Sequence, residues 1–115
     1  MSIPKYDGAP DLYEEQEDLV RNRRHLPLRE RLLRRAALTD RSTLDASAED
    51  GKAVQMIISA AFNLADHDRE HCTAAGPIRP DSLTTSSTLP HLRAYIRQEY
   101  AAHQQAPARQ NGAKL

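Results

Sequence analysis

The segment from residue 48 to residue 75 carries the apolar pattern that most restricts how this chain folds. Its apolar side chains recur three and four residues apart, which is the spacing of one face of an α-helix. They are Val54, Ile57, Ile58, Ala61, Leu64 and Ala65. Met56, Ala60 and Phe62 are apolar but lie off this stripe, so we expect other helices to cover its middle on more than one side. The pattern predicts a long central helix.

Three further helices are predicted from charge order and apolar spacing. Residues 11–25 place acidic side chains before basic ones, an order that complements the helix dipole. Residues 27–38 begin with a proline in the first turn and carry Leu and Ala along one face. The last helix is expected to be capped by Thr88, and no segment alternates as strands do. The sequence therefore predicts an all-α fold, a small four-helix bundle with a long central third helix.

Proline, glycine and polar residues predict the limits of this domain. Residues 1–10 contain two prolines and a glycine and are expected to form a flexible lead-in. The loop 76–89 is rich in Pro, Ser and Thr. Residues 106–115 lack periodicity and are expected to be a disordered tail. A single helical domain over residues 11–105 is predicted.

The ends of the central helix carry their own signals. Ser47 opens a capping-box pattern, in which its side chain would bind the first exposed backbone N–H groups. The pair Gly76 and Pro77 is expected to end the helix, because glycine adopts left-handed backbone easily and proline cannot continue a helix.

Composition restricts the compartment and the class of partner. The formal net charge is zero, so the chain lacks the basic excess that attracts nucleic acids or membranes as a whole. One cysteine allows no internal disulfide, and no signal peptide or membrane-spanning run is recognised. We therefore expect a cytoplasmic protein without a membrane partner. Thirteen arginines against three lysines, with much alanine, are typical of GC-rich genomes such as those of actinobacteria.

Residues 66–72 gather two histidines, three carboxylates and the cysteine. His67 and His71 lie four residues apart, so both can reach one metal ion from one helix face. The run between them resembles the H-x-x-E-H motif of inverzincin metalloproteases, in which the histidines bind metal and the glutamate is the general base. It also resembles the histidine pair of DinB-type four-helix bundles, whose metal site takes a third histidine from another helix. Here that ligand would be His25, His91 or His103.

A helical projection separates these side chains. Cys72 falls on the apolar stripe, whereas His67 lies roughly 140° around the helix from it. The cysteine and both histidines therefore cannot converge on one ion from a straight helix. We expect Cys72 to be buried in the core and the three carboxylates, Asp66, Asp68 and Glu70, to be solvated. His67 and His71 remain as candidate ligands of a divalent transition metal, and no other cofactor is expected.

The stretch of residues 21–35 holds seven arginines against one glutamate. Arginines in this density can bind nucleic-acid phosphates. The candidates are Arg21, Arg23, Arg24, Arg29, Arg31, Arg34 and Arg35. Five acidic residues precede them in residues 11–18, so charge-balanced helix faces with pairs such as Glu30–Arg34 are the alternative.

Catalytic motifs are sparse. Arg97 and His103 lie six residues apart, which is similar to the Arg and His of HEPN-type ribonucleases, but the resemblance covers two residues. Phosphate-binding glycine loops, a nucleophile elbow and a CxxC motif are absent from the sequence. No catalytic residue is assigned, and we do not expect an enzyme.

The function expected from the sequence is that of a small non-enzymatic cytosolic interaction or regulatory protein. A core with only five aromatic residues is thin, so we expect a protein partner or a homodimer to cover an apolar helical face. Two alternatives stay open: a nucleic-acid-associated regulator that uses the arginines of residues 21–35, and a metal-binding helical bundle that uses His67 and His71.

Overall fold

A computed structural model describes residues 11–44 and 50–114 of the chain. Within these residues the fold is all-α, with no strand. The α-helices are α1 (Leu12–Asn22), α2 (Leu28–Ser42), α3 (Gly51–His71) and α4 (Leu89–Lys114). The short 3-10 helices are η1 (Arg23–His25) and η2 (Pro80–Ser82). The predicted all-α architecture with four helices is confirmed.

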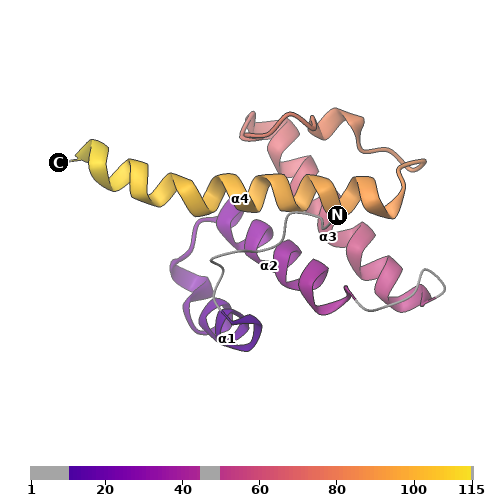
Figure 1. Ribbon diagram of the computed structural model, residues 1–115, viewed down its shortest axis with the longest axis horizontal. Coiled ribbons are helices and arrows are strands. Elements are labelled where there is room, and N and C mark those ends of the chain that lie inside the picture. Colours follow the sequence, from indigo (N-terminus) through magenta and orange to yellow (C-terminus); the bar gives the residue numbers. More distant parts are fainter. Residues whose placement is uncertain (1–10, 45–49, 115) are drawn as a thin grey trace, which may run out of the picture.

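The helices α2, α3 and α4 pack against one another, and α1 packs on α2. Helix α4 crosses α2 and α3, and its C-terminal part projects beyond them (Figure 1). Helix α1 lies at the side of α2 away from α3 (Figure 1). Glu15 and Leu19 are the residues of α1 that are buried. This helix is therefore the one least embedded in the core.

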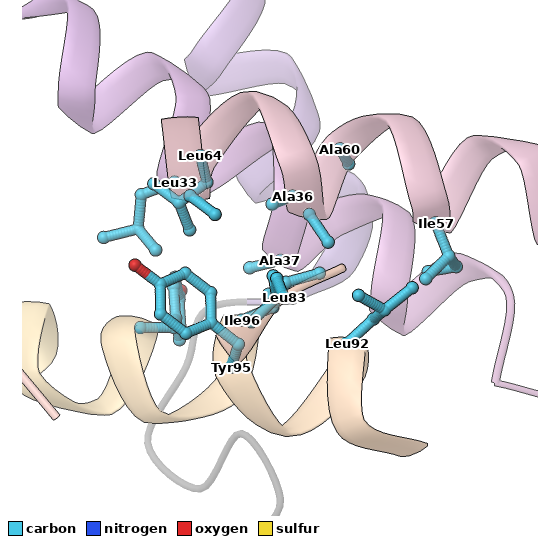
Figure 2. Packing of buried hydrophobic residues seen from close by; sticks show 13 residues of the cluster. Leu33, Ala36, Ala37, Ile57, Ala60, Leu64, Leu83, Leu92, Tyr95 and Ile96 are labelled. Carbon is cyan, nitrogen blue, oxygen red and sulfur yellow. The ribbon is translucent and has the colours of Figure 1, made fainter. Parts of the chain in front are cut away.

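The core is formed by the apolar faces of α2, α3 and α4 (Figure 2). Its fully buried larger side chains are Leu33, Ile57, Leu64, Leu92, Tyr95 and Ile96. Alanines of α2 and α3 fill the space between them, which lets these helices approach closely. Most of the predicted stripe of α3 lies in this core, namely Ile57, Ala61, Leu64 and Ala65. Ile58 of the stripe and Phe62 beside it are partly buried against the core.

Helix α3 is shorter at both ends than residues 48–75. Asp50 is its N-cap, and the Asp50 carboxylate accepts a hydrogen bond of 3.1 Å from the backbone N–H of Ala53. The predicted cap at Ser47 lies outside the described residues. The helix ends at His71 because Cys72 adopts a left-handed backbone with φ of 56°. The expected stop at Gly76 and Pro77 is therefore wrong by one turn.

Helix α4 begins as predicted and continues further than predicted. The Thr88 hydroxyl accepts a 3.3 Å hydrogen bond from the backbone N–H of His91, which is the expected cap. At the other end, residues 106–114 are helical, although the sequence suggests a tail without periodicity. The lead-in over residues 1–10 lies outside the described residues.

Candidate functional site

The two candidate metal ligands lie together in the last turns of α3. The ring centroids of His67 and His71 are 4.3 Å apart. Nδ1 of His67 is buried without a hydrogen-bond partner and lies 3.8 Å from Oδ1 of Asp68. Among residues 11–44 and 50–114, no group of three His, Cys, Asp or Glu side chains is arranged to hold a metal ion. Metal binding by this pair stays a prediction.

Two expectations for this segment are wrong. Cys72 is exposed, because the helix ends one residue earlier and the projection of a straight helix no longer applies to it. Asp68 is not solvated but only 1% exposed. Asp66 and Glu70 are exposed as expected. The reactive side chains of residues 66–72 therefore divide between the interior and the surface.

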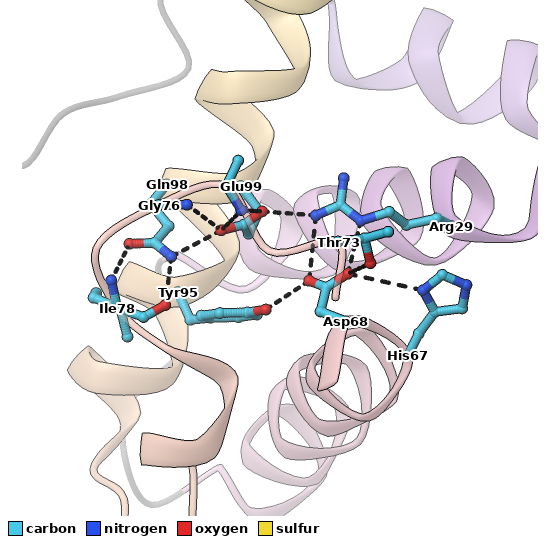
Figure 3. A network of polar contacts seen from close by, with 10 residues as sticks. Arg29, His67, Asp68, Thr73, Gly76, Ile78, Tyr95, Gln98 and Glu99 are labelled. Atoms are coloured by element: carbon cyan, nitrogen blue, oxygen red, sulfur yellow. Dashed lines mark hydrogen bonds and ion pairs between the residues drawn. The ribbon is translucent and has the colours of Figure 1, made fainter. Parts of the chain in front are cut away.

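Asp68 is the centre of a buried polar network (Figure 3). Its Oδ1 accepts hydrogen bonds of 2.7 Å from Nε of Arg29 and 2.7 Å from the Thr73 hydroxyl. Its Oδ2 accepts hydrogen bonds from the guanidinium of Arg29 and from the Tyr95 hydroxyl. Burial by itself raises the pKa of Asp68, but these hydrogen bonds outweigh burial and hold the pKa below its usual value. Asp68 is thus an ionised group whose acceptor positions are used inside the fold.

The guanidinium of Arg29 also reaches Glu99 on α4, at 2.6 Å (Figure 3). The Glu99 carboxylate accepts hydrogen bonds of 2.9 Å from the backbone N–H groups of Ala75 and Gly76. Gln98 beside it bonds both the N–H and the carbonyl of Ile78. These contacts hold the segment after α3 against α4. They explain why α3 does not continue to Gly76, since the amides there are bound by Glu99.

Two more buried carboxylates join the helices elsewhere. Asp40 at the end of α2 accepts hydrogen bonds from Arg93 and Arg97 of α4. Glu15 of α1 accepts 2.6 Å and 2.8 Å hydrogen bonds from Arg41 and from the Tyr100 hydroxyl. A signal for such acids exists in the sequence, because each lies four residues from a buried apolar side chain on the same helix face. Sequence reasoning missed them because charged residues are rarely fully buried.

The arginine-rich stretch divides into inward and outward side chains. Arg29 belongs to the network of Figure 3. Arg34 also turns inward and pairs at 3.6 Å with Glu30, as the four-residue spacing predicts. Arg21 forms an exposed pair with Glu17 at 3.8 Å. The side chain of Arg23 lies outside the described part of the chain.

The remaining arginines of the stretch line a groove of about 480 Å³ between α1 and α2. Its lining residues are Leu19, Val20, Arg24, Leu28, Arg31, Leu32 and Arg35. Within the described residues, no carboxylate pairs with the three arginines of this groove. Nε of Arg31 is buried and has no hydrogen-bond partner. The groove thus combines an apolar floor with guanidinium groups that the fold does not use.

A shallower groove along α1 adjoins the first and shares Val20 with it. Tyr13 lies in this second groove and is 67% exposed. Val20 and Leu28 are 68% and 51% exposed. We refer to Tyr13 together with the seven lining residues of the first groove as the α1–α2 face. In the described residues, the other exposed large apolar side chains are Leu44 and Met56, which lie outside this face.

Comparison with known proteins adds no assignment. No protein-family model matches the chain, and neither a curated protein nor a solved structure does. Among the helices of residues 11–44 and 50–114, none has the length and apolar character needed to cross a bilayer.

Proposed function

We propose that this chain is a small non-enzymatic cytosolic interaction protein that binds a partner protein through the α1–α2 face. The observation that carries the proposal is that exposed Val20 and Leu28 line one groove, and exposed Tyr13 lines an adjoining groove that shares Val20 with it. Contiguous exposed apolar surface with a polar rim is typical of protein interaction sites, whereas single exposed apolar residues are ordinary.

The interior supports a binding role over acid–base chemistry. Asp68 and Glu99 are held by arginine, tyrosine and backbone donors within the fold. Glu15 and Asp40 are held in the same way by side chains of α2 and α4. Buried carboxylates with these partners orient the helices and keep the outer face of α2 fixed in position.

The charge of the groove favours a different protein over a second copy of this chain. In a two-fold symmetric dimer the same patch meets itself. Such a dimer through the groove would bring Arg24, Arg31 and Arg35 near the same arginines of the second copy, where like charges repel. A partner that offers carboxylates avoids this repulsion.

The proposal is tested by site-specific photocrosslinking in the native host. A photoreactive residue replaces Leu28 in the full chain, and the matched control places it at Met56, which is 43% exposed and lies on α3. We expect a crosslinked segment of another protein at position 28 that is absent at position 56. A product containing only a second copy or nucleic acid, or equal products at both positions, would overturn the proposal.

A further inference from the structure

We propose that the groove of the α1–α2 face binds an amphipathic helix of the partner that carries acidic side chains beside its apolar stripe. This inference rests on the proposed function and names the chemistry of the segment that fills the groove.

The shape of the groove fits a helix. Leu28, Arg31, Leu32 and Arg35 follow one another at the spacing of a single helix face on α2. Leu19 and Val20 of α1 line the same groove. Two neighbouring helices with apolar residues in the groove between them are the surface into which a third, amphipathic helix packs.

The charge of the groove selects acidic side chains on that helix. Arg31 and Arg35 are one helical turn apart, about 6 Å along the axis of α2. Carboxylates one turn apart on an incoming helix have the same spacing, so each can meet one guanidinium.

A nucleic-acid backbone fits the same surface less well. Phosphates would pair with the arginines but would leave Val20, Leu28 and Leu32 against a polar sugar–phosphate chain. An acidic amphipathic helix satisfies the apolar floor and the arginines together.

The test measures binding of labelled synthetic helices by fluorescence anisotropy. The probe is a blocked peptide of about 15 residues, long enough to form helix, with a leucine stripe flanked by glutamates. The matched probe has lysine in place of every glutamate, and a duplex DNA is the third. We expect the full-length protein to bind the glutamate peptide at least about tenfold more tightly than the lysine peptide, with an affinity that falls as salt rises.

Variants of the protein locate the effect. The double change Arg31→Glu and Arg35→Glu is expected to reverse the preference between the two peptides, and Arg35→Glu alone to reduce it if the double variant does not fold. Leu28→Glu is expected to weaken the binding of both peptides. The control Arg79→Glu changes an exposed arginine outside the face and is expected to leave binding unchanged.

Equal binding of the two peptides, or tighter binding of DNA than of either, would overturn the inference. Crosslinking at Leu28 separates this failure from failure of the proposed function. If position 28 recovers a partner protein while the peptides bind equally, the interaction role stands and the acidic helix is wrong.

Discussion

Replacing Asp68 by asparagine removes the charge at the centre of the buried network without opening a cavity. The native carboxylate accepts hydrogen bonds from three side chains, those of Arg29, Thr73 and Tyr95. An asparagine has one acceptor oxygen, and its amide nitrogen would face donors. Arg29 would then lose one of its two anionic partners while remaining mostly buried.

The loss of stability expected for Asp68→Asn follows from the burial of the ion pair between Asp68 and Arg29. Breaking a buried ion pair by removing one partner destabilises a protein by about 3–5 kcal/mol. Arg29 keeps Glu99 as a second partner at 2.6 Å, so we expect the lower end of this range, about 3 kcal/mol. At about 4 °C for each kcal/mol in a domain of this size, the melting temperature falls by about 12 °C.

Urea denaturation followed by circular dichroism measures this loss. The matched control is Asp66→Asn on the same helix, whose ion pair with Arg69 is exposed and screened by solvent, so we expect its loss to change stability little. Because the folded-state pKa of Asp68 is lowered, its stabilisation is complete above the unfolded-state pKa of about 3.9 and is lost as pH falls through the folded-state value. The difference between wild type and Asp68→Asn should therefore shrink only in acid. Equal denaturation midpoints of the two variants at pH 7 would refute the network's role.

Three other changes test separate contacts. Gly76→Ala places a Cβ 2.3 Å from Cδ of Gln98, so the Gln98 side chain must move and lose its hydrogen bonds to the backbone of Ile78. We expect this change to lower the free energy of unfolding by about 1–2 kcal/mol and to speed amide exchange in the segment after α3. In its control, Gly51→Ala at the first residue of α3, the new Cβ meets no atom within 4 Å, so we expect no loss of stability. Glu15→Gln weakens the attachment of α1, so we expect amide exchange to accelerate there more than in α3; uniform acceleration would contradict this. Cys72 has a left-handed backbone with φ of 56°, which glycine adopts without strain. We therefore expect Cys72→Gly to raise the free energy of unfolding by about 1 kcal/mol and with it the melting temperature. A melting temperature below that of the wild type would count against strain at this position.

The apolar pattern of the sequence was enough to predict the fold class and the faces of the helices. Ile57, Leu64 and Ala65 lie in the core because residues at helical spacing share one face, and the same holds for Tyr95 and Ile96. The end of α3 was not predictable in this way. It depends on Glu99, which lies more than twenty residues later and captures backbone amides that would otherwise continue the helix.

The candidate site was only partly predictable for a related reason. The stretch of residues 21–35 does contain the arginines of the groove, but the sequence treats all seven alike. Arg29 and Arg34 form ion pairs with carboxylates of other helices, Asp68 and Asp18 among them, and are therefore not free to bind a partner. Local spacing predicts the pairs Glu30–Arg34 and Glu17–Arg21, but it cannot show that Arg29 pairs with Asp68 or Arg34 with Asp18, because these contacts join different helices.

Chemical-shift mapping on the isotopically labelled full chain, titrated with the acidic amphipathic peptide, tests the central claim most directly. We predict saturable shifts of the backbone amides of Val20, Leu28 and Arg35, with none at Leu44 and Met56. Shifts that are largest at Leu44 or Met56, or the absence of saturable shifts at Val20 and Leu28, would contradict the claim that the α1–α2 face is the binding site.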